Sequence, residues 1–441
     1  MKDNDIQIPR EEPFKNDILN RKPIAENFTK IFNNMDGNLV VGIDAPWGTG
    51  KTTFIKMWKE YLASIEDYKT IYFNAWENDD SDDPLLAIIY QLEEQYNGKN
   101  DKIDNIKKYG AQLIKKTVPI GLRLLTNGIL DVKDVKLGEF NESEFVDLAG
   151  KLGEVEYSKF KQSKNAKSEF KKTLIEFQKE QNKKIIFFID ELDRCRPSFA
   201  IETLEKIKHL FDIDNYFFII SLDKQQLSCS ISTLYGQDMD SLGYLRRFID
   251  LDYSLPIPDK RNYVEMMINT YKLNRDNWFW VYLKKMIDLM DYSLRDIDKL
   301  FYYLKIILPS TIFHKDGKEY SDAYSAVMGI VYSFLISIKL KKPLLYNKIV
   351  LKNYKTSSLI NEININDIKL DKYFNNQLRL IMIDTLSAFL NRNLKSNAES
   401  KYEDFNLKFD SIYGEYNLNR LWENNKCIVI NQLDFLDNFF I

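Results

Sequence analysis

The chain carries the octapeptide Ala45-Pro46-Trp47-Gly48-Thr49-Gly50-Lys51-Thr52. Before it runs a short apolar segment, Asn38 to Asp44, which is rich in β-branched residues, as a buried strand is. After it, residues 53–62 carry apolar side chains at helical spacing. A strand, a glycine-rich turn and a helix in this order are typical of a phosphate-binding loop, in which backbone N–H groups and the positive end of the helix dipole face the anion.

This loop contains the residue types that bind a nucleoside triphosphate together with Mg²⁺. Lys51 is expected to reach the β- and γ-phosphates, and the Thr52 hydroxyl is expected to bind Mg²⁺. Ala45 stands where such loops usually begin with glycine, and because alanine avoids positive φ we expect the start of the loop to differ slightly. The residues predicted to surround the phosphates are Pro46, Trp47, Gly48, Thr49, Gly50, Lys51, Thr52 and Thr53. The alternative is a glycine-rich turn that merely starts a helix.

A second motif lies where the apolar run from Lys184 to Ile189 ends in the acids Asp190 and Glu191. Such a run predicts a central parallel strand that delivers its carboxylates to the carboxyl edge of the sheet. There Asp190 would join Thr52 in binding Mg²⁺, and Glu191 would polarise an attacking water. The two acids favour hydrolysis of the nucleotide over transfer of its phosphoryl group by a kinase. The alternative is a strand end followed by a solvated acidic turn.

Composition narrows the function classes. The 441 residues carry a formal net charge of −3, so no overall basic field indicates nucleic-acid binding. The cysteines and histidines have no paired or metal-binding spacing, which argues against a disulfide framework and a zinc site. The first residues are polar, unlike a secretory signal, and no apolar run is long enough to span a bilayer. We therefore expect a cytoplasmic protein without a transmembrane segment.

Apolar strands alternate with helical patterns from residue 38 to about residue 256. This alternation predicts an α/β fold with a doubly wound, mainly parallel sheet and the nucleotide at its carboxyl edge. We expect an NTPase core over residues 1–260 with a helical insertion at about 85–180. Beyond the core the pattern is helical. It predicts a helical lid over 261–310 and an all-α C-terminal region over 311–441, either a domain of its own or an extension of the lid.

Four blocks of sequence occur in a specific order: Asp44 to Thr53, Phe73 to Trp76, Ile189 to Cys195, and Phe218 to Asp223 followed by Tyr244 to Phe248. In this order they resemble the KAP P-loop NTPases, a branch of the additional-strand ATPases related to the AAA+ and STAND groups. The resemblance covers about residues 18–310. The family usually has two aspartates where this chain has Asp190 and Glu191. Many bacterial members also carry transmembrane helices between the first and third blocks, whereas the insertion in this chain contains no adequate span.

The resemblance implies a particular order of strands. An additional strand is expected between the phosphate-loop strand and the Asp190 strand. The segment from Tyr216 to Asp223 resembles the strand beside the phosphate loop, with Asp223 as a sensor near the γ-phosphate. A polar group at that edge can orient the attacking water; the alternative is a polar strand cap.

Three arginines resemble residues that complete such sites. Arg246 and Arg247 lie where related ATPases place an arginine on the γ-phosphate of a neighbouring subunit, which would offset charge in the transition state. The alternative is a solvated arginine pair at the start of a strand. Arg295 follows Ser293, a predicted N-cap, and resembles the sensor arginine of a helical lid that reaches the nucleotide. An exposed arginine in a first helical turn is the alternative.

For three other side chains near these motifs we expect a structural role rather than contact with the nucleotide. Trp47 and Trp76 could stack on a nucleobase, but large aromatic side chains beside a sheet are more often core, and we expect them there. Arg194 is expected to pair with Asp190 or Asp193 and so to order the acidic turn.

These features predict a Mg²⁺-dependent protein that binds and hydrolyses ATP and acts as a conformational switch. Because bacterial KAP relatives are linked to phage exclusion, the resemblance implies anti-phage defence. One alternative is a binding-only ATP switch that recruits a partner, which would have no need of Glu191. A second is an ATP-driven nucleic-acid motor or loader, which lacks the support of a basic stripe. We expect the helical C-terminal region either to form a homo-oligomer or to bind a partner protein.

Overall fold

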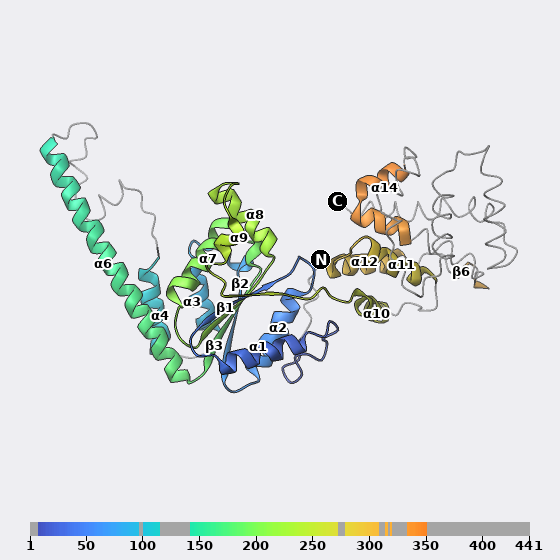
Figure 1. Cartoon of the computed structure of the whole chain (residues 1–441), viewed down its shortest axis with the longest axis horizontal. Coiled ribbons are helices and arrows are strands. Elements are labelled where there is room, and N and C mark those ends of the chain that lie inside the picture. Colours follow the sequence, from blue (N-terminus) through green and yellow to red (C-terminus); the bar gives the residue numbers. More distant parts are fainter. Residues whose placement is uncertain are drawn as a thin grey trace. The chain divides into compact units, whose positions relative to one another are not determined.

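The computed structural model describes residues 8–96, 100–114, 142–271, 278–307, 314–315, 318–319 and 333–350 (Figure 1). The chain divides into two compact units, Met1–Ile257 and Pro258–Ile441, and each is described by itself. The boundaries predicted at residues 260 and 310 stay predictions. Most of the C-terminal region predicted over 311–441 lies outside the described residues.

The first unit is built on a five-stranded sheet in the order β2-β3-β4-β1-β5, in which every neighbouring pair is parallel. Its strands are β1 (Leu39–Asp44), β2 (Tyr68–Asn74), β3 (Lys184–Asp190), β4 (Tyr216–Leu222) and β5 (Leu251–Ser254). Strand β4 lies between β1 and β3, so both the predicted additional strand and its identity are confirmed. The predicted α/β class with a parallel sheet is confirmed as well.

The register brings the ends of the strands to one edge. Asp44 at the end of β1 pairs with Leu222 of β4, and Asn74 at the end of β2 pairs with Asp190 of β3. Because all five strands run in the same direction, the loops that follow them meet at the carboxyl edge of the sheet. The phosphate loop and the acidic turn therefore share this edge, with the end of β4 between them.

Helices cover both faces of the sheet (Figure 1). One face carries α1 (Lys22–Asn34) and α2 (Lys51–Ala63). The other carries α3 (Pro84–Glu94), α4 (Asp101–Gln112), α6 (Glu142–Gln181) and α7 (Pro197–Leu210). Side chains of β3 alternate between the two cores, with Phe188 packed among α1 and α2 and Phe187 on the opposite face. With helices packed on both faces of the sheet, the unit is a three-layer α/β/α fold.

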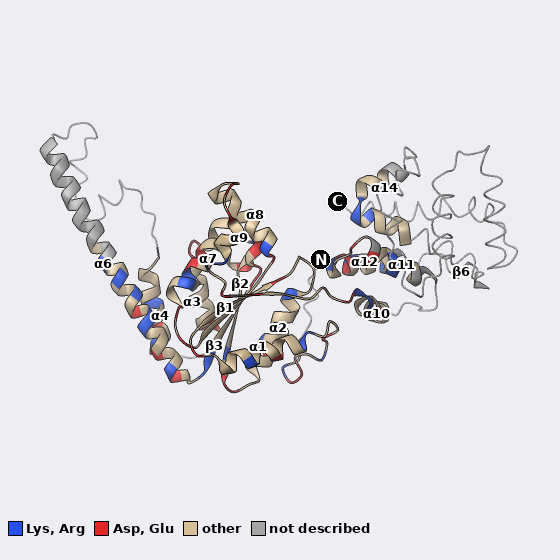
Figure 2. Ribbon diagram, viewed as in Figure 1, with Lys and Arg blue, Asp and Glu red and all other residues tan. Residues whose placement is uncertain are grey.

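The predicted insertion at 85–180 is mainly helical in its described part. The C-terminal half of α6 is not peripheral, because Phe170, Leu174 and Phe177 are fully buried in the core of the unit. Figure 2 shows basic and acidic residues interspersed along α4 and the coloured part of α6. Within the described ranges, no helix is both long enough and apolar enough to cross a membrane.

The second unit is mainly helical in its described part. It contains α10 (Lys260–Thr270), α11 (Trp278–Leu289), α12 (Leu294–Ile307), α14 (Pro343–Val350) and a short antiparallel ladder of β6 (His314–Lys315) with β7 (Lys318–Glu319). Trp280 stacks on Phe301 with ring centroids 5.7 Å apart. The Ser293 hydroxyl accepts a hydrogen bond from the Asp296 N–H at 3.2 Å, so the predicted N-cap of α12 is confirmed.

Candidate nucleotide site

Two glycines give the phosphate loop its shape. Gly48 and Gly50 have φ values of 75° and 82°, a region that residues with a Cβ rarely adopt. Ala45, which stands in place of the usual first glycine, is not among the residues with positive φ, so alanine fits there without strain. Gly50 precedes α2 and has no side chain to cap it, which leaves the first N–H groups of the helix for another acceptor. An anion is the acceptor that such a helix start favours.

The loop holds its lysine inward. Lys51 is 9% exposed, and its Nζ donates to the backbone oxygens of Ala45 at 2.5 Å and Pro46 at 3.2 Å. Burial lowers the pKa of Lys51, and several carboxylates at the sheet edge oppose this shift. In order of decreasing effect they are Asp193, Asp223, Asp190 and Asp44. The negative charges at the end of β3 therefore act on the Lys51 ammonium of the phosphate loop.

Asp190 is a buried and oriented carboxylate at the end of β3. It is 1% exposed; one oxygen accepts from the Tyr72 hydroxyl at 2.9 Å and the other from the Glu191 N–H at 3.0 Å. Burial, together with the charge of Asp190 and this hydrogen bond, raises the pKa of Tyr72. Tyr72 therefore stays a donor and fixes the carboxylate, as outer-shell groups do for metal ligands.

Glu191 has an unusual backbone and an engaged side chain. Its φ is +60°, and among the described non-glycine residues with positive φ the others are all Asn or Asp, which adopt this region more readily. The Arg194 guanidinium lies 2.6 Å from its carboxylate, and the Asn74 amide donates to it at 3.4 Å. Arg194 also lies over the Trp76 ring, 5.4 Å from its centroid. The prediction that Arg194 pairs with Asp190 or Asp193 is therefore wrong, because the turn brings it to Glu191 instead.

The two tryptophans are not core residues, so that prediction is also wrong. Trp47 is 45% exposed and Trp76 is 52% exposed. The Trp47 indole N–H donates to the Asp193 carboxylate at 2.5 Å, which ties the phosphate loop to the acidic turn. Asp193 is buried, and it is not among the site residues predicted from the sequence. Its only signal was a third acid close behind Asp190.

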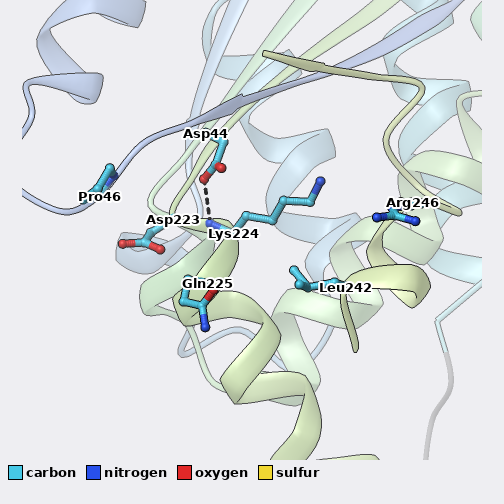
Figure 3. Close-up of a pocket in the computed structure, with 7 residues that line it drawn as sticks. All are labelled: Asp44, Pro46, Asp223, Lys224, Gln225, Leu242 and Arg246. Atoms are coloured by element: carbon cyan, nitrogen blue, oxygen red, sulfur yellow. Dashed lines mark hydrogen bonds between the residues drawn. The ribbon is translucent and has the colours of Figure 1, made fainter. Parts of the chain in front are cut away.

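Asp223 has two roles at the edge of the sheet. Its carboxylate accepts from the Gln226 N–H at 3.1 Å and so caps the helix α8 (Lys224–Tyr235). It also lines a pocket of about 330 Å³ beside the phosphate loop (Figure 3). The residues that line this pocket are Asp44, Pro46, Asp223, Lys224, Gln225, Leu242 and Arg246. The Asp44 carboxylate accepts from the Lys224 N–H at 2.9 Å and holds this corner together.

The three predicted arginines have different local surroundings. Arg246 lines the pocket, whereas Arg247 lies over the ring of Tyr244, 5.8 Å from its centroid. Both are exposed, as the alternative of a solvated arginine pair expects, but neither opens a strand. They follow the short helix α9 (Ser241–Leu245), and β5 begins only at Leu251. Arg295 lies in the first turn of α12 in the second unit, and its contact with nucleotide stays a prediction.

A fourth arginine reaches the loop from the N-terminal side. Arg21, which precedes α1, is 2% exposed and donates through Nη1 to the Gly50 oxygen at 2.9 Å and through Nη2 to the Thr49 oxygen at 2.7 Å. No sequence motif indicated a role for Arg21. A short segment before a helix gives no sign that its arginine contacts a loop 28 residues away.

The donor set fits a nucleotide with Mg²⁺. Thr52, half-buried in the first turn of α2, offers a hydroxyl, and Asp190 offers an oriented carboxylate. Among the described residues no cluster of three or more His, Cys, Asp or Glu forms a metal site. The hydroxyl of Thr52 and the carboxylate of Asp190 suit Mg²⁺, which proteins bind through one or two carboxylates together with substrate phosphates.

Two known proteins resemble part of this chain. It is 23% identical over 247 residues to the phage T7 exclusion protein of Escherichia coli (strain K12), covering 54% of this chain but only 33% of that protein. It is 29% identical over 171 residues to an uncharacterized protein of Methanocaldococcus jannaschii, covering 33% of this chain and 86% of that protein.

A solved structure and a family model match as well. The structure of the Aeropyrum pernix ORC2 protein (ADPNP-ADP complexes) matches 94% of each chain at 15% identity, with a TM-score of 0.31. The model of the KAP family P-loop domain matches residues 21–311, more than half of the chain. This match confirms the resemblance seen in the four sequence blocks. The chain belongs to the KAP family of P-loop NTPases.

Proposed function

We propose that the protein binds ATP with Mg²⁺, hydrolyses it and changes conformation with the state of the nucleotide. The observation that supports this most strongly is the meeting of the phosphate loop and the acidic end of β3 at one edge of a parallel sheet. The carboxylates of Asp190 and Asp193 attract the Lys51 ammonium, so the acidic turn interacts electrostatically with the phosphate loop. Membership of a P-loop NTPase family supports the same reading.

Each residue would have a distinct role. The loop N–H groups and Lys51 would bind the phosphates, while Thr52 and Asp190 would hold Mg²⁺. Mg²⁺, when bound, supplies charge neutralisation to the phosphate oxygens. Glu191 would orient the attacking water and accept its proton. Arg246 lines the pocket beside Pro46. It would offset the negative charge that develops on the phosphates of the nucleotide bound by its own chain, rather than by a neighbouring subunit.

The contacts of Glu191 favour a gated enzyme. With Arg194 at 2.6 Å and Asn74 at 3.4 Å, the carboxylate is engaged by its own chain. A change at the γ-phosphate that released Glu191 would couple turnover to conformation. The same contacts favour a second candidate function, a binding-only switch in which Glu191 stays engaged and ATP only recruits a partner.

Defence against phage is the cellular role that we propose. The support is the 23% identity to a protein named for phage T7 exclusion, of which this chain spans 33%. We further propose that the protein acts in the cytoplasm and that residues 258–441 form the surface for self-association or a partner. Plaque formation on bacteria that express the parent or Lys51→Ala tests this role. Equal plaque numbers with both would contradict it.

Phosphate release and nucleotide binding together test the biochemical proposal. Lys51→Ala should lose ATP binding and turnover. Glu191→Gln should keep ATP binding while turnover falls by about 10²–10⁴-fold, the range for loss of a general base. Glu202→Gln, an exposed acid on α7, is the matched control and should behave like the parent. Tight ATP binding without turnover in the parent protein would reject hydrolysis and support the binding-only switch.

A further inference from the structure

The contacts of Arg21 have a directional consequence for the phosphate loop. In a trans peptide unit the C=O and the following N–H point in opposite directions. The Thr49 oxygen belongs to the same peptide unit as the Gly50 N–H, and the Gly50 oxygen to the same unit as the Lys51 N–H. Because Arg21 holds both oxygens, at 2.7 and 2.9 Å, it turns these two N–H groups toward the opposite side of the loop.

The guanidinium is built into the fold rather than resting on its surface. Arg21 is 2% exposed, and its Cζ lies 5.9 Å from the ring centroid of Phe54, a core residue of α2. Burial lowers the pKa of Arg21 to about 10, so the group stays charged at neutral pH. Gly50 O also accepts from the Phe54 N–H at 3.1 Å, so Arg21 shares this acceptor with the first turn of α2. A planar fork with several donors can bind two neighbouring oxygens at once, which a lysine cannot do in the same way.

We propose that Arg21 is a positioning residue for the β-phosphate of the bound nucleotide. It holds the carbonyl groups of Thr49 and Gly50 away from the anion, so that the N–H groups of Gly50 and Lys51 face it. Without this restraint, the peptide unit between Thr49 and Gly50 can rotate more easily, since glycine gives little steric resistance. The unit between Gly50 and Lys51 loses one of two restraints and keeps the hydrogen bond from the Phe54 N–H. This proposal rests on nucleotide binding at the loop, but not on hydrolysis.

Affinity measurements with ADP and ATP test the proposal apart from turnover. Arg21→Met keeps much of the side-chain length but removes the donors, and we expect it to weaken both nucleotides by about tenfold or more, as loss of charge-assisted hydrogen bonds does. The factor should be similar for ADP and ATP, because both carry the β-phosphate. Arg21→Lys, which keeps the charge without the fork, should recover part of the affinity.

The chain offers a matched control at the other end of α1. The Lys184 Nζ donates to the backbone oxygens of Phe32 at 2.5 Å and Met35 at 3.1 Å, so it too is a cation that holds backbone carbonyls. It does so at the start of β3, away from the carboxyl edge. We expect both Lys184→Met and Arg21→Met to lower the melting temperature, but Lys184→Met should bind ADP and ATP like the parent.

The measurement is made by titration at a temperature where circular dichroism shows each variant to be folded. Parent-like affinities in Arg21→Met would overturn the proposal. So would an equal loss of affinity in Lys184→Met, because the effect would then follow from general destabilisation of α1. A parent protein that binds ATP without hydrolysing it would reject the proposed hydrolysis while leaving this test intact.

Discussion

Arg194 Nη1 lies 2.6 Å from Glu191 Oε1, within a single turn that follows β3. The two side chains are 24% and 14% exposed, so the pair is partly shielded from water. Glu191 is the acid that hydrolysis would need, and it also has a strained φ of +60°. The structure therefore shows the proposed general base held by a residue of its own chain.

Release of this ion pair should accelerate turnover. We expect Arg194→Met to raise the basal rate of phosphate release about fivefold, which corresponds to an ion pair of ~1 kcal/mol. Steady-state phosphate release at saturating ATP measures the effect. Arg196→Met is the control, because Arg196 lies two residues further on and pairs with Asp79 instead of Glu191. A slower Arg194 variant would mean that this arginine assists the reaction rather than restraining Glu191.

The pocket beside the phosphate loop distinguishes Arg246 from its neighbour. Because Arg246 lines that pocket and Arg247 lies over Tyr244, Arg246→Ala should lower kcat by at least about 10²-fold and Arg247→Ala by only a few-fold. Mixing Arg246→Ala with Lys51→Ala then tests which chain supplies the arginine. An arginine acting within its own chain predicts no recovery in the mixture. Recovered turnover would show that Arg246 acts on the nucleotide of a neighbouring subunit.

Local sequence patterns predicted the parts of the site that are contiguous in the chain. Lys51 follows a glycine-rich turn and Asp190 ends an apolar run, so strand, turn and helix signals placed both at one edge of the sheet. Arg21 and Asp193 escaped prediction because their roles depend on contacts made across 28 and 146 residues. Such contacts depend on tertiary packing and have no periodicity in the sequence.

The wrong predictions share a physical cause. Trp47 and Trp76 were expected in the core because large apolar rings usually gain most from burial. Each has instead an electrostatic partner, the buried Asp193 for Trp47 and Arg194 for Trp76. An indole N–H and a ring face can satisfy such partners while exposed, and composition does not reveal this. Arg194 was likewise assigned to the wrong acid, because the left-handed backbone at Glu191 could not be read from residue types.

The buried Asp193 should make stability depend on pH. Burial raises the pKa of its carboxyl above the ordinary 3.8, and the hydrogen bond from Trp47 opposes this shift. The folded state thus binds this proton more tightly than the unfolded chain. The resulting stabilisation is full below the unfolded pKa and is lost as pH rises through the folded pKa.

Asp193→Asn, which is neutral at every pH, isolates this contribution. Relative to the parent, its free energy of unfolding should increase as pH rises from about 4 to about 7, because only the parent acquires a buried charge over that range. Urea unfolding without nucleotide, at several pH values, measures the difference between the two proteins. A difference that stays constant, or decreases with rising pH, would show that the folded state does not raise this pKa.

The start of α3 provides a test of stability away from the nucleotide. Asp83, 4% exposed, accepts from the Leu85 N–H at 2.8 Å, and its other oxygen lies 3.0 Å from Lys206 Nζ on α7. Asp83→Ala removes the N-cap and leaves the Lys206 ammonium without this partner, and we expect a loss of about 2–4 kcal/mol. Asp83→Asn keeps the cap and should lose about half as much. The urea unfolding midpoint, followed by circular dichroism, measures both. Equal losses in the two variants would assign the stability to the ion pair alone, whereas a parent-like Asp83→Asn would assign it to the cap.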